Sequence, residues 1–352
     1  MKSAIMNTLF RNFRTAFAVL TCSLALWACS DEDEDIIYEP QHAEVQHECL
    51  RPDYLQPGDM IAVVSPAYIT DDASIQQGME AVRNMGFQPV LAPNANSVYL
   101  ERYAGTPVQR ASDLEWAYSN PQVKAIMATR GGYGTLQLLP LLKADMPHDH
   151  PKWLIGYSDI TTLLAYSVTA GVMAIHGTML SSLKNSGGTG DDDLMLKNML
   201  MGIIPTYEWA SEGKPNRAGT AKGMLVGGNM CTFTPLIGSA YDFTAKGDII
   251  LFVEEVGENA RNIDRMMYTL KLHGVLPRVK GILVGDFAGC GDEFKIGSIE
   301  EMLDKYTLSD VRIPIAYGFH AGHAGTNWPL IEGAPATLSV SADHASLTFD
   351  VP

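Results

Sequence analysis

The stretch Trp153-Leu154-Ile155-Gly156-Tyr157-Ser158-Asp159-Ile160-Thr161-Thr162 decides the fold of this chain. A short apolar run ends at Gly156, Ser158 follows two residues later, and residues 161–169 are compatible with a helix. This order predicts a strand, a tight turn and a helix, with a hydroxyl group at the turn. The amides of the first helical turn lack partners within the helix and can stabilise an oxyanion.

The same turn has a second, structural interpretation. Ser and Asp often accept a hydrogen bond from the first turn of a helix, so Ser158 or Asp159 can serve as the N-cap. Turns of this kind are common in α/β proteins, and the segment taken alone favours the cap over a catalytic role.

Further strands and helices alternate around this turn. We predict strands at 58–67, 89–92, 124–129, 153–156 and 172–176, and helices at 74–85, 106–119, 136–142 and 160–169. This alternation indicates a mostly parallel sheet covered on both faces. We therefore expect an α/β domain over residues 57–182 that carries Ser158.

The composition changes after residue 182. Residues 183–219 include two loop-like stretches rich in Gly, Asp and other polar residues, and we interpret them as a linker. Beyond them we predict strands at 223–226, 248–253, 279–284 and 336–340, and a helix at 261–273. Strands with fewer helices predict a second, α+β domain over residues 220–352.

The first residues are typical of an exported lipoprotein. Basic residues precede an apolar run at 16–27 that is too short to span a bilayer comfortably. The run ends in Leu26-Trp27-Ala28-Cys29, which resembles a bacterial lipobox. We expect a lipoprotein signal peptide over residues 1–28 and lipidation of Cys29; the alternative is an ordinary secretory signal.

An acidic run at 30–35 opens a segment, 29–56, that we interpret as a solvated tether. Acyl chains at Cys29 would anchor the protein to a membrane of the cell envelope, and we expect the outer membrane, at its periplasmic or surface face.

Charge and cysteine content exclude several classes of protein. With 25 Lys and Arg against 40 Asp and Glu, the formal net charge is −15, which argues against binding to nucleic acid or to anionic lipid. The five cysteines, Cys22, Cys29, Cys49, Cys231 and Cys290, are scattered and form no CxxC pair. We therefore expect no disulfide framework, metal or other cofactor.

A glycine-rich loop, Arg130-Gly131-Gly132-Tyr133-Gly134, lies between a predicted strand and a predicted helix. It matches neither the dinucleotide-binding pattern nor the P-loop pattern. Its backbone amides can face a ligand at the carboxyl edge of the sheet, where open α/β sheets bind ligands. A tight turn without a ligand is the alternative.

Several other polar residues have mainly structural interpretations. We interpret His148-Asp149-His150 as surface, Asp191-Asp192-Asp193 as a solvated loop and His176 as a buried, hydrogen-bonded residue. Glu254-Glu255 ends an apolar run, and a carboxylate at a strand end can orient a histidine. His320 and His323 occupy a glycine-rich segment but lack further metal ligands at a helpful spacing.

Ser158, Glu254 and His323 together give the order Ser, Glu, His. A serine needs a base to be nucleophilic at neutral pH, and a carboxylate fixes the tautomer of that base. The α/β-hydrolase elbow requires a second glycine where this chain has Ile160, so we expect a different hydrolase fold.

From about Leu55 to Val351 the chain resembles the LD-carboxypeptidases of serine peptidase family S66, which include muramoyltetrapeptide carboxypeptidases and microcin-C-resistance peptidases. The segments that carry the resemblance share their order and spacing with the family: Gly58-Asp59, Ser65-Pro66-Ala67, Tyr103-Ala104-Gly105-Thr106, Arg130 to Gly134, Gly156 to Asp159, Gly223 to Asn229, Glu254 with Asp264-Arg265-Met266, Gly274 to Arg278, and Gly318 to His323.

The resemblance implies a role for each candidate residue. Ser158 would be the nucleophile, His323 the general base and Glu254 the orienting carboxylate. Backbone amides of Asp159 and of the Gly131-Gly132 turn would form the oxyanion hole. An arginine should bind the substrate carboxylate, with Arg130 the candidate by position and Arg265 a weaker one.

The family's fold implies an N-terminal flavodoxin-like or amidotransferase-like α/β domain and a C-terminal swivelling β/α domain, often in a homodimer. The implied reaction is metal-free hydrolysis of an amide between an L-centre and a terminal D-amino acid, such as D-Ala of a peptidoglycan tetrapeptide. Two alternatives stay open: a peptidase acting on a microcin-C-type peptide–nucleotide antibiotic, and a surface lipoprotein that binds muropeptides without turnover.

Overall fold

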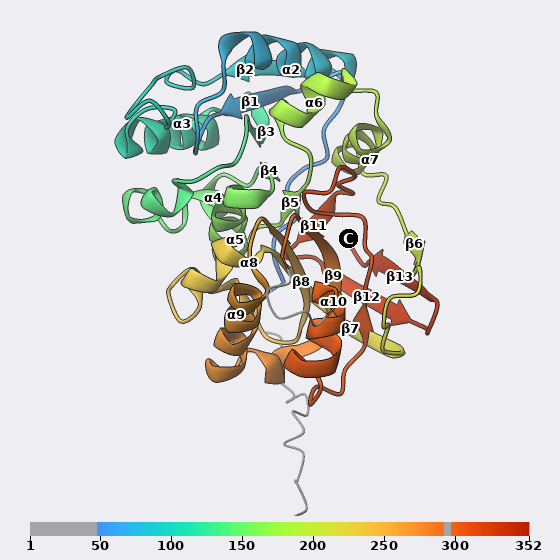
Figure 1. Cartoon of the computed structure of the whole chain (residues 1–352). Helices are drawn as coiled ribbons and strands as arrows, with labels where there is room; N and C mark the ends of the chain where they lie inside the picture. Colours follow the sequence, from blue (N-terminus) through green and yellow to red (C-terminus); the bar gives the residue numbers. More distant parts are fainter. Residues whose placement is uncertain (1–47, 292–296, 352) are drawn as a thin grey trace, which may run out of the picture. The chain divides into compact units, whose positions relative to one another are not determined.

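A computed structural model of the chain describes residues 48–291 and 297–351. The predicted signal peptide, Cys29 and residues 29–47 of the predicted tether lie outside the described residues. Within the described part, no helix combines the length and the apolar character needed to cross a membrane. Two β-sheets dominate the described part (Figure 1).

The first sheet has six strands in the order β11-β5-β4-β3-β1-β2. Five of them run parallel, and β11 pairs with β5 in the antiparallel direction. The bounds of the strands are β1 Met60–Val64, β2 Gln88–Leu91, β3 Val123–Ala128, β4 Trp153–Gly156, β5 Ala174–His176 and β11 Leu330–Glu332. The parallel α/β sheet predicted for the first half of the chain is therefore confirmed, and β4 has the predicted bounds.

Helices connect these strands, and two of them, α2 and α3, begin at a residue whose side chain caps the helix. The bounds are α2 Asp72–Asn84, α3 Pro107–Ser119, α4 Met146–Asp149, α5 Thr161–Thr169 and α6 Leu180–Ser186. The Thr106 side chain accepts from Gln109 N, and the Gln109 side chain accepts from Thr106 N, which forms a capping box at the start of α3. The helix predicted over 136–142 is wrong: two 3₁₀ turns, Thr135–Gln137 and Leu139–Leu141, replace it, because Pro140 lacks the amide that a continuous helix needs.

The second sheet has seven strands in the order β10-β9-β8-β7-β12-β13-β6. The strands β7 to β10 are parallel neighbours, and β12, β13 and β6 extend the sheet in antiparallel pairs. The bounds of its strands are β6 Tyr207–Ala210, β7 Gly219–Asn229, β8 Ile249–Val256, β9 Val279–Ala288, β10 Ile315–Ala316, β12 Pro335–Val340 and β13 His344–Phe349. The bounds of its helices are α8 Met230–Phe233, α9 Ala260–Leu272 and α10 Ile299–Met302.

The segment 183–219 is more ordered than the linker interpretation expects. It contains the end of α6, the helix α7 (Asp191–Leu200) and the strand β6 of the second sheet. Asp191, Asp192 and Asp193 form the first turn of α7, so their interpretation as a solvated loop is wrong. Carboxylates are stabilised at a helix N-terminus because the unpaired amides carry partial positive charge there, and these residues can therefore begin a helix.

Direct contacts join the two sheets. Thr161 Oγ1, at the start of α5, accepts a hydrogen bond of 3.3 Å from Asn229 N at the end of β7. The carboxylate of Glu332, at the end of β11, accepts one of 2.9 Å from Gly227 N. One cluster of buried apolar residues includes strands of both sheets, so the described domains share a core.

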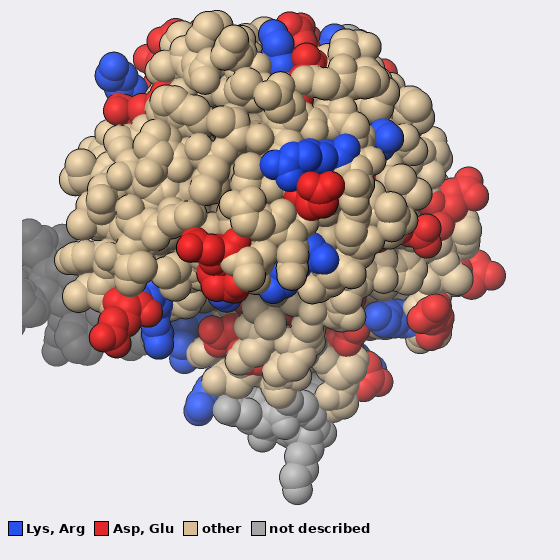
Figure 2. Space-filling model, turned by 90° about the horizontal axis from the view of Figure 1, so that it is seen from above, with Lys and Arg blue, Asp and Glu red and all other residues tan. Residues whose placement is uncertain are grey.

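Acidic and basic side chains are interspersed on the face seen in Figure 2. Among the described residues drawn there, Lys and Arg form small groups beside Asp and Glu rather than one continuous area. This face therefore offers no extended basic surface to a polyanion.

Gly78 tests the packing of α2 on α6. A Cβ atom there would lie 2.4 Å from Leu180 Cγ and 2.7 Å from the Leu180 carbonyl oxygen. We expect Gly78→Ala to lower the free energy of unfolding by about 1–3 kcal/mol, although Ala is the better helix former by about 1 kcal/mol. Urea denaturation measures this, with the exposed Gln77→Ala as the control on the same helix; equal stability of Gly78→Ala and native protein would contradict the packing.

Candidate active site

Ser158 sits at the turn between β4 and α5 with a left-handed backbone. Its φ is +63°, a conformation that costs energy in residues other than glycine and often marks a functional turn. A 3₁₀ turn, Ser158–Ile160, leads into α5. A Cβ at residue 156 would lie 2.7 Å from Ile160 Cγ2. Ile160 can therefore pack against the end of β4 only because residue 156 is glycine.

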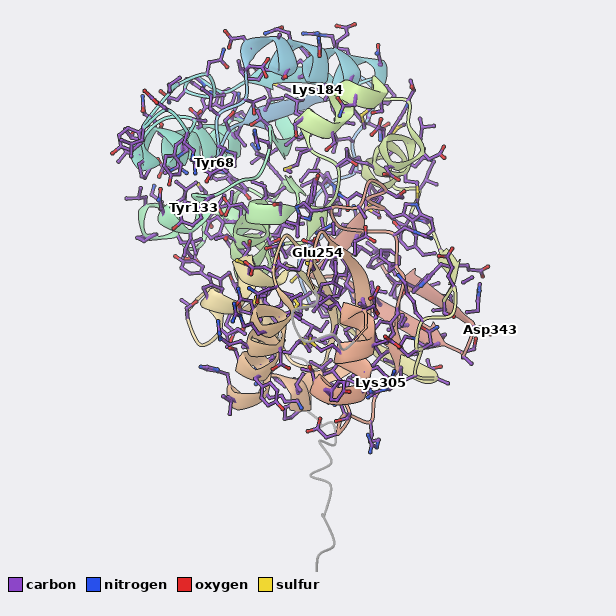
Figure 3. The ribbon with its side chains drawn as sticks, viewed as in Figure 1. Tyr68, Tyr133, Lys184, Glu254, Lys305 and Asp343 are labelled. Atoms are coloured by element: carbon purple, nitrogen blue, oxygen red, sulfur yellow. The ribbon has the colours of Figure 1, made fainter. Side chains whose placement is uncertain are left out.

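The glycine-rich loop lies directly against this turn. A Cβ at Gly131 would be 3.0 Å from Ser158 Cβ, 3.1 Å from Ser158 Oγ and 3.3 Å from Asp159 N. Gly132 lies under the ring of Tyr68, and the Arg130 guanidinium carbon is 6.0 Å from the centre of that ring. The residues expected at the oxyanion hole are thus neighbours of Ser158; Tyr68 lies with Tyr133 in the same region of Figure 3.

Neither candidate N-cap residue caps the helix. The starts of the 3₁₀ turn and of α5 carry no side-chain cap bond. The buried carboxylate of Asp159 instead accepts a hydrogen bond of 3.0 Å from Thr135 N, which ties the turn to the segment after the glycine loop. Burial raises the pKa of Asp159, and the bonds from Thr135 and the charge of Arg110 oppose that rise.

Glu254 and His323 form a hydrogen-bonded pair. His323 Nδ1 lies 2.7 Å from Glu254 Oε2, and the Glu254 side chain is fully buried near the end of β8. Burial alone would lower the pKa of His323, but the hydrogen bond and negative charge of Glu254 outweigh it, and the pKa is raised. A proton on Nδ1 facing the carboxylate leaves Nε2 free to act as a base.

The neighbouring alternatives are engaged elsewhere. The carboxylate of Glu255 accepts from Asn229 Nδ2 at 2.8 Å, Cys231 N at 2.7 Å and Val256 N at 2.9 Å. The ring of His320 packs edge-on against Trp328, with 4.6 Å between their centres. Glu254 and His323, in contrast, hydrogen bond to each other, which suits proton transfer.

Tyr157 connects Ser158 to this pair. Its ring centre lies 5.0 Å from that of His323, and Ser158 is the next residue along the chain. No direct hydrogen bond joins Ser158 Oγ to His323 in the described structure. Catalytic hydrogen bonds are often long in the absence of substrate and shorten when it binds.

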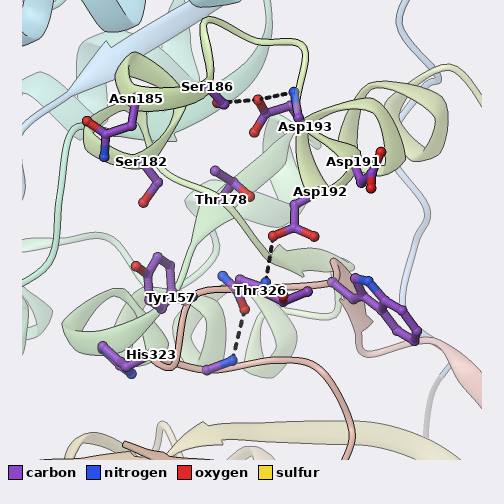
Figure 4. A pocket seen from close by; sticks show the side chains of 15 residues that line it. Tyr157, Thr178, Ser182, Asn185, Ser186, Asp191, Asp192, Asp193, His323 and Thr326 are labelled. Atoms are coloured by element: carbon purple, nitrogen blue, oxygen red, sulfur yellow. Dashed lines mark hydrogen bonds between the residues drawn. The ribbon is translucent and has the colours of Figure 1, made fainter. Parts of the chain in front are cut away.

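Two cavities adjoin these residues. The His323 cavity, of about 550 Å³, is lined by His323, Tyr157 and polar residues of α6 and α7 (Figure 4). The Ser158 cavity, of about 250 Å³, is lined by Ser158, Gly132 and residues around the ends of β7 and β8. The seryl turn and the Glu–His pair therefore lie next to space that can hold a substrate.

The loop that carries His323 is held by residues that sequence reasoning did not place in the site. Asn327 Oδ1 accepts from Gly322 N at 3.1 Å and lies 3.2 Å from His176 Nε2. Asn327 N donates to Asp192 at 2.7 Å. His176 is fully buried, as expected, and burial lowers its pKa to about 3, so the ring is neutral. No sequence motif marks this network, because its members are far apart in the chain.

The remaining candidates do not contribute to this site. His148, Asp149 and His150 are exposed, as expected. Within residues 48–291 and 297–351, no group of three or more His, Cys, Asp or Glu side chains is arranged to hold a metal ion. The two tryptophans nearest in sequence to the candidate residues differ in position. Trp153 is buried and its ring nitrogen donates a hydrogen bond to the Asp53 carbonyl, so it lies away from the cavities, whereas Trp328 lines the His323 cavity.

Comparison with known proteins agrees with this architecture. Residues 61–177 match the LD-carboxypeptidase N-terminal domain, and residues 222–338 match the LD-carboxypeptidase C-terminal domain. A protein of Synechocystis sp. that carries a carboxypeptidase name is 32% identical over 315 residues, which cover 85% of this chain and 97% of that protein. The murein tetrapeptide carboxypeptidase of Pseudomonas aeruginosa is 28% identical over 282 residues, 76% of this chain and 90% of that enzyme.

A solved structure shows the same fold. The microcin C7 self-immunity protein MccF superposes with a TM-score of 0.72 at 24% identity, covering 85% of this chain and 98% of that one. The two matched segments include most strands of both sheets. The chain therefore belongs to the LD-carboxypeptidase family.

Proposed function

We propose that this serine-type carboxypeptidase hydrolyses the amide between an L-centre and a terminal D-amino acid, releasing D-Ala from peptidoglycan tetrapeptides. The observation that carries the proposal is the hydrogen bond between His323 and the buried Glu254, beside the left-handed turn at Ser158. The name of the Pseudomonas relative supports murein tetrapeptides as the substrate class.

Each residue has a defined chemical part in this reaction. His323 Nε2 removes the proton from Ser158 Oγ as that oxygen attacks the carbonyl carbon, and Glu254 stabilises the imidazolium that forms. The amides of Asp159 and the Gly131-Gly132 turn stabilise the oxyanion. His323 then gives its proton to the leaving D-amino acid, and water, activated by the same imidazole, hydrolyses the acyl-enzyme.

The leaving residue carries a carboxylate, which needs a cationic partner. We propose Arg130 for this role, because it is exposed and directly precedes Gly131, which lies against Ser158. Arg265 is a poorer candidate, since it lies on the exposed side of α9 and bonds Asn262.

We also propose that Cys29 is lipidated and anchors the enzyme in the cell envelope, and that the enzyme forms a homodimer. The lipobox-like sequence before Cys29 supports the anchor. Metabolic labelling with a fatty-acid analogue should label native protein and not Cys29→Ala. Protease treatment of intact cells then distinguishes the surface face from the periplasmic face.

Substitution of Ser158 tests the reaction. With a muropeptide tetrapeptide as substrate, we expect Ser158→Ala to lower D-Ala release by at least about 10³-fold, because the nucleophile is lost. Mass spectrometry of the products measures this, with the exposed Ser112→Ala as a matched control.

The same assay should include a pentapeptide and a microcin-type peptide–nucleotide. Selective hydrolysis of the last would favour the antibiotic peptidase that the similarity to MccF suggests. Binding without turnover by the native protein would contradict the enzymatic proposal and support a muropeptide-binding lipoprotein.

The pH dependence tests the role of the pair. His323 must be neutral to act as the base, so kcat/KM should rise with pH through its raised pKa. Glu254→Gln removes the charge that raises this pKa, so the acid limb should move to lower pH while the maximum rate falls. An acid limb that stays in place in Glu254→Gln would show that another group titrates.

A further inference from the structure

Arg110 is a charged side chain in the interior of the α/β domain that the proposed reaction does not use. It belongs to α3 and is only 1% exposed. A guanidinium has five N–H donors and stays protonated in proteins, so its burial is costly unless most of these donors are paired. The acceptors that pair them show what this buried charge holds together.

Arg110 connects three loops of the first sheet. Its Nη1 donates to the Pro66 carbonyl at 2.6 Å and to the Gly134 carbonyl at 3.0 Å, and its Nε donates to the Gly105 carbonyl at 3.2 Å. Its Nη2 donates to Gln137 Oε1 at 2.7 Å. The three carbonyls lie in the loops that follow β1, β2 and β3. Because these strands are parallel, the loops meet at the carboxyl edge of the sheet, which is also the edge where β4 leads into the seryl turn.

The third of these loops is the glycine-rich loop beside Ser158. Gly132 and Gly134 have φ values of +124° and +129°, which glycine adopts readily, so the loop has little conformational preference of its own. A Cβ at Gly134 would lie 2.7 Å from Arg110 Nη1, so the guanidinium packs directly against the loop. Oxyanion donors are effective because they are held in place before the reaction, and Arg110 supplies such a hold.

The charge of Arg110 also acts on Asp159, whose amide is a proposed oxyanion donor. Burial raises the pKa of Asp159, and the positive charge of Arg110 is one of the influences that oppose this rise. The described residues that line the Ser158 cavity include Asp159, Glu255 and Glu258 but no Lys or Arg. An oxyanion that forms beside these carboxylates is therefore repelled unless a nearby positive charge offsets them.

We propose that Arg110 is a positioning residue for the oxyanion hole. Its hydrogen bonds fix the glycine-rich loop, and its charge offsets the negative charge of Asp159 beside the developing oxyanion. The inference rests on the proposed function, because an oxyanion forms only when Ser158 attacks a carbonyl. The guanidinium is buried and each of its nitrogens donates to the protein, so Arg110 acts without contact to the substrate.

Two substitutions of Arg110 separate its charge from its bonds. Arg110→Lys keeps the charge but has one nitrogen in place of three, and Arg110→Met removes both charge and bonds. With a muropeptide tetrapeptide as substrate, we expect kcat to fall about 10-fold in Arg110→Lys and at least about 100-fold in Arg110→Met, because the oxyanion is stabilised less well. KM should change by less than about 2-fold, since the ground state contains no oxyanion. The exposed Arg83→Met, on α2, removes the same charge and should change neither constant.

A substitution of Asp159 tests the electrostatic part of the role. Asp159→Asn removes the negative charge and keeps an oxygen that can accept from Thr135 N. If Arg110 offsets that charge, Arg110→Met combined with Asp159→Asn should have a kcat at least about 5-fold above that of Arg110→Met alone. A purely structural role of Arg110 predicts no such recovery, because nothing in the double variant restores the lost bonds.

Thermal denaturation measures the folding of each variant separately. Where an Arg110 variant is unfolded at the assay temperature, Gln137→Leu replaces it. This change removes one acceptor of the guanidinium and should lower kcat about 3-fold at unchanged KM.

An unchanged kcat in folded Arg110→Met or in Gln137→Leu, an effect confined to KM, or no recovery in the double variant would overturn the inference. Failure of the proposed function is a separate outcome, in which native protein releases no D-Ala. The rate at which a fluorophosphonate labels Ser158 decides the inference in that event, because the phosphonyl oxygen needs the same oxyanion donors. Labelling at least about 10-fold slower in Arg110→Met than in native protein supports the inference, and equal rates, or no labelling of Ser158, overturn it.

Discussion

The hydrogen bond between His323 and Glu254 is the interaction on which the site depends. Glu254 is fully buried, and a buried carboxylate is costly unless it is paired and hydrogen bonded. Its partner must therefore be held in place. Gly322 makes this possible, because its φ is +135° and a Cβ there would lie 3.1 Å from Glu254 Oε2. Asn327 and His176 then hold the loop through hydrogen bonds.

Ser158, the proposed nucleophile, follows a strand of the first sheet, and Glu254, which bonds the proposed base, lies in a strand of the second sheet. Contacts between the sheets therefore also set the distance between these groups. Thr161, three residues after Ser158, bonds Asn229, which pairs with Glu254 in the register of β7 and β8. Glu332 reaches from β11 of the first sheet to Gly227 of the second. Burial raises the pKa of Glu332 to about 8, so this link carries no charge at neutral pH.

Much of the fold follows from local patterns in the sequence. The bounds of β4 are predicted because an apolar run ends at Gly156, and α3 because Thr106 and Pro107 mark its start. The helix over 136–142 fails because Pro140 interrupts it. Composition alone predicts a solvated loop for the acidic residues 191–193. Their position at the start of α7 explains their charge, and that position is visible only in the folded chain.

The candidate site was predictable to a lesser degree. The order of Ser158, Glu254 and His323 along the chain, together with the family resemblance, predicts these three residues. No pattern in the sequence gives the distance between Glu254 and His323. His176 and Asn327 were missed as supports of the His323 loop because they are 151 residues apart and meet only in the folded chain.

The central claim is that the Glu254–His323 pair activates Ser158. Labelling with a fluorophosphonate, followed by peptide mass spectrometry, tests it most directly, because the reagent reacts with an activated serine and needs no knowledge of the substrate. The account predicts one adduct, on Ser158, that forms at least about 10²-fold more slowly in Glu254→Gln. Labelling at another residue, or equal labelling rates in native protein and Glu254→Gln, would contradict the claim that the pair activates Ser158.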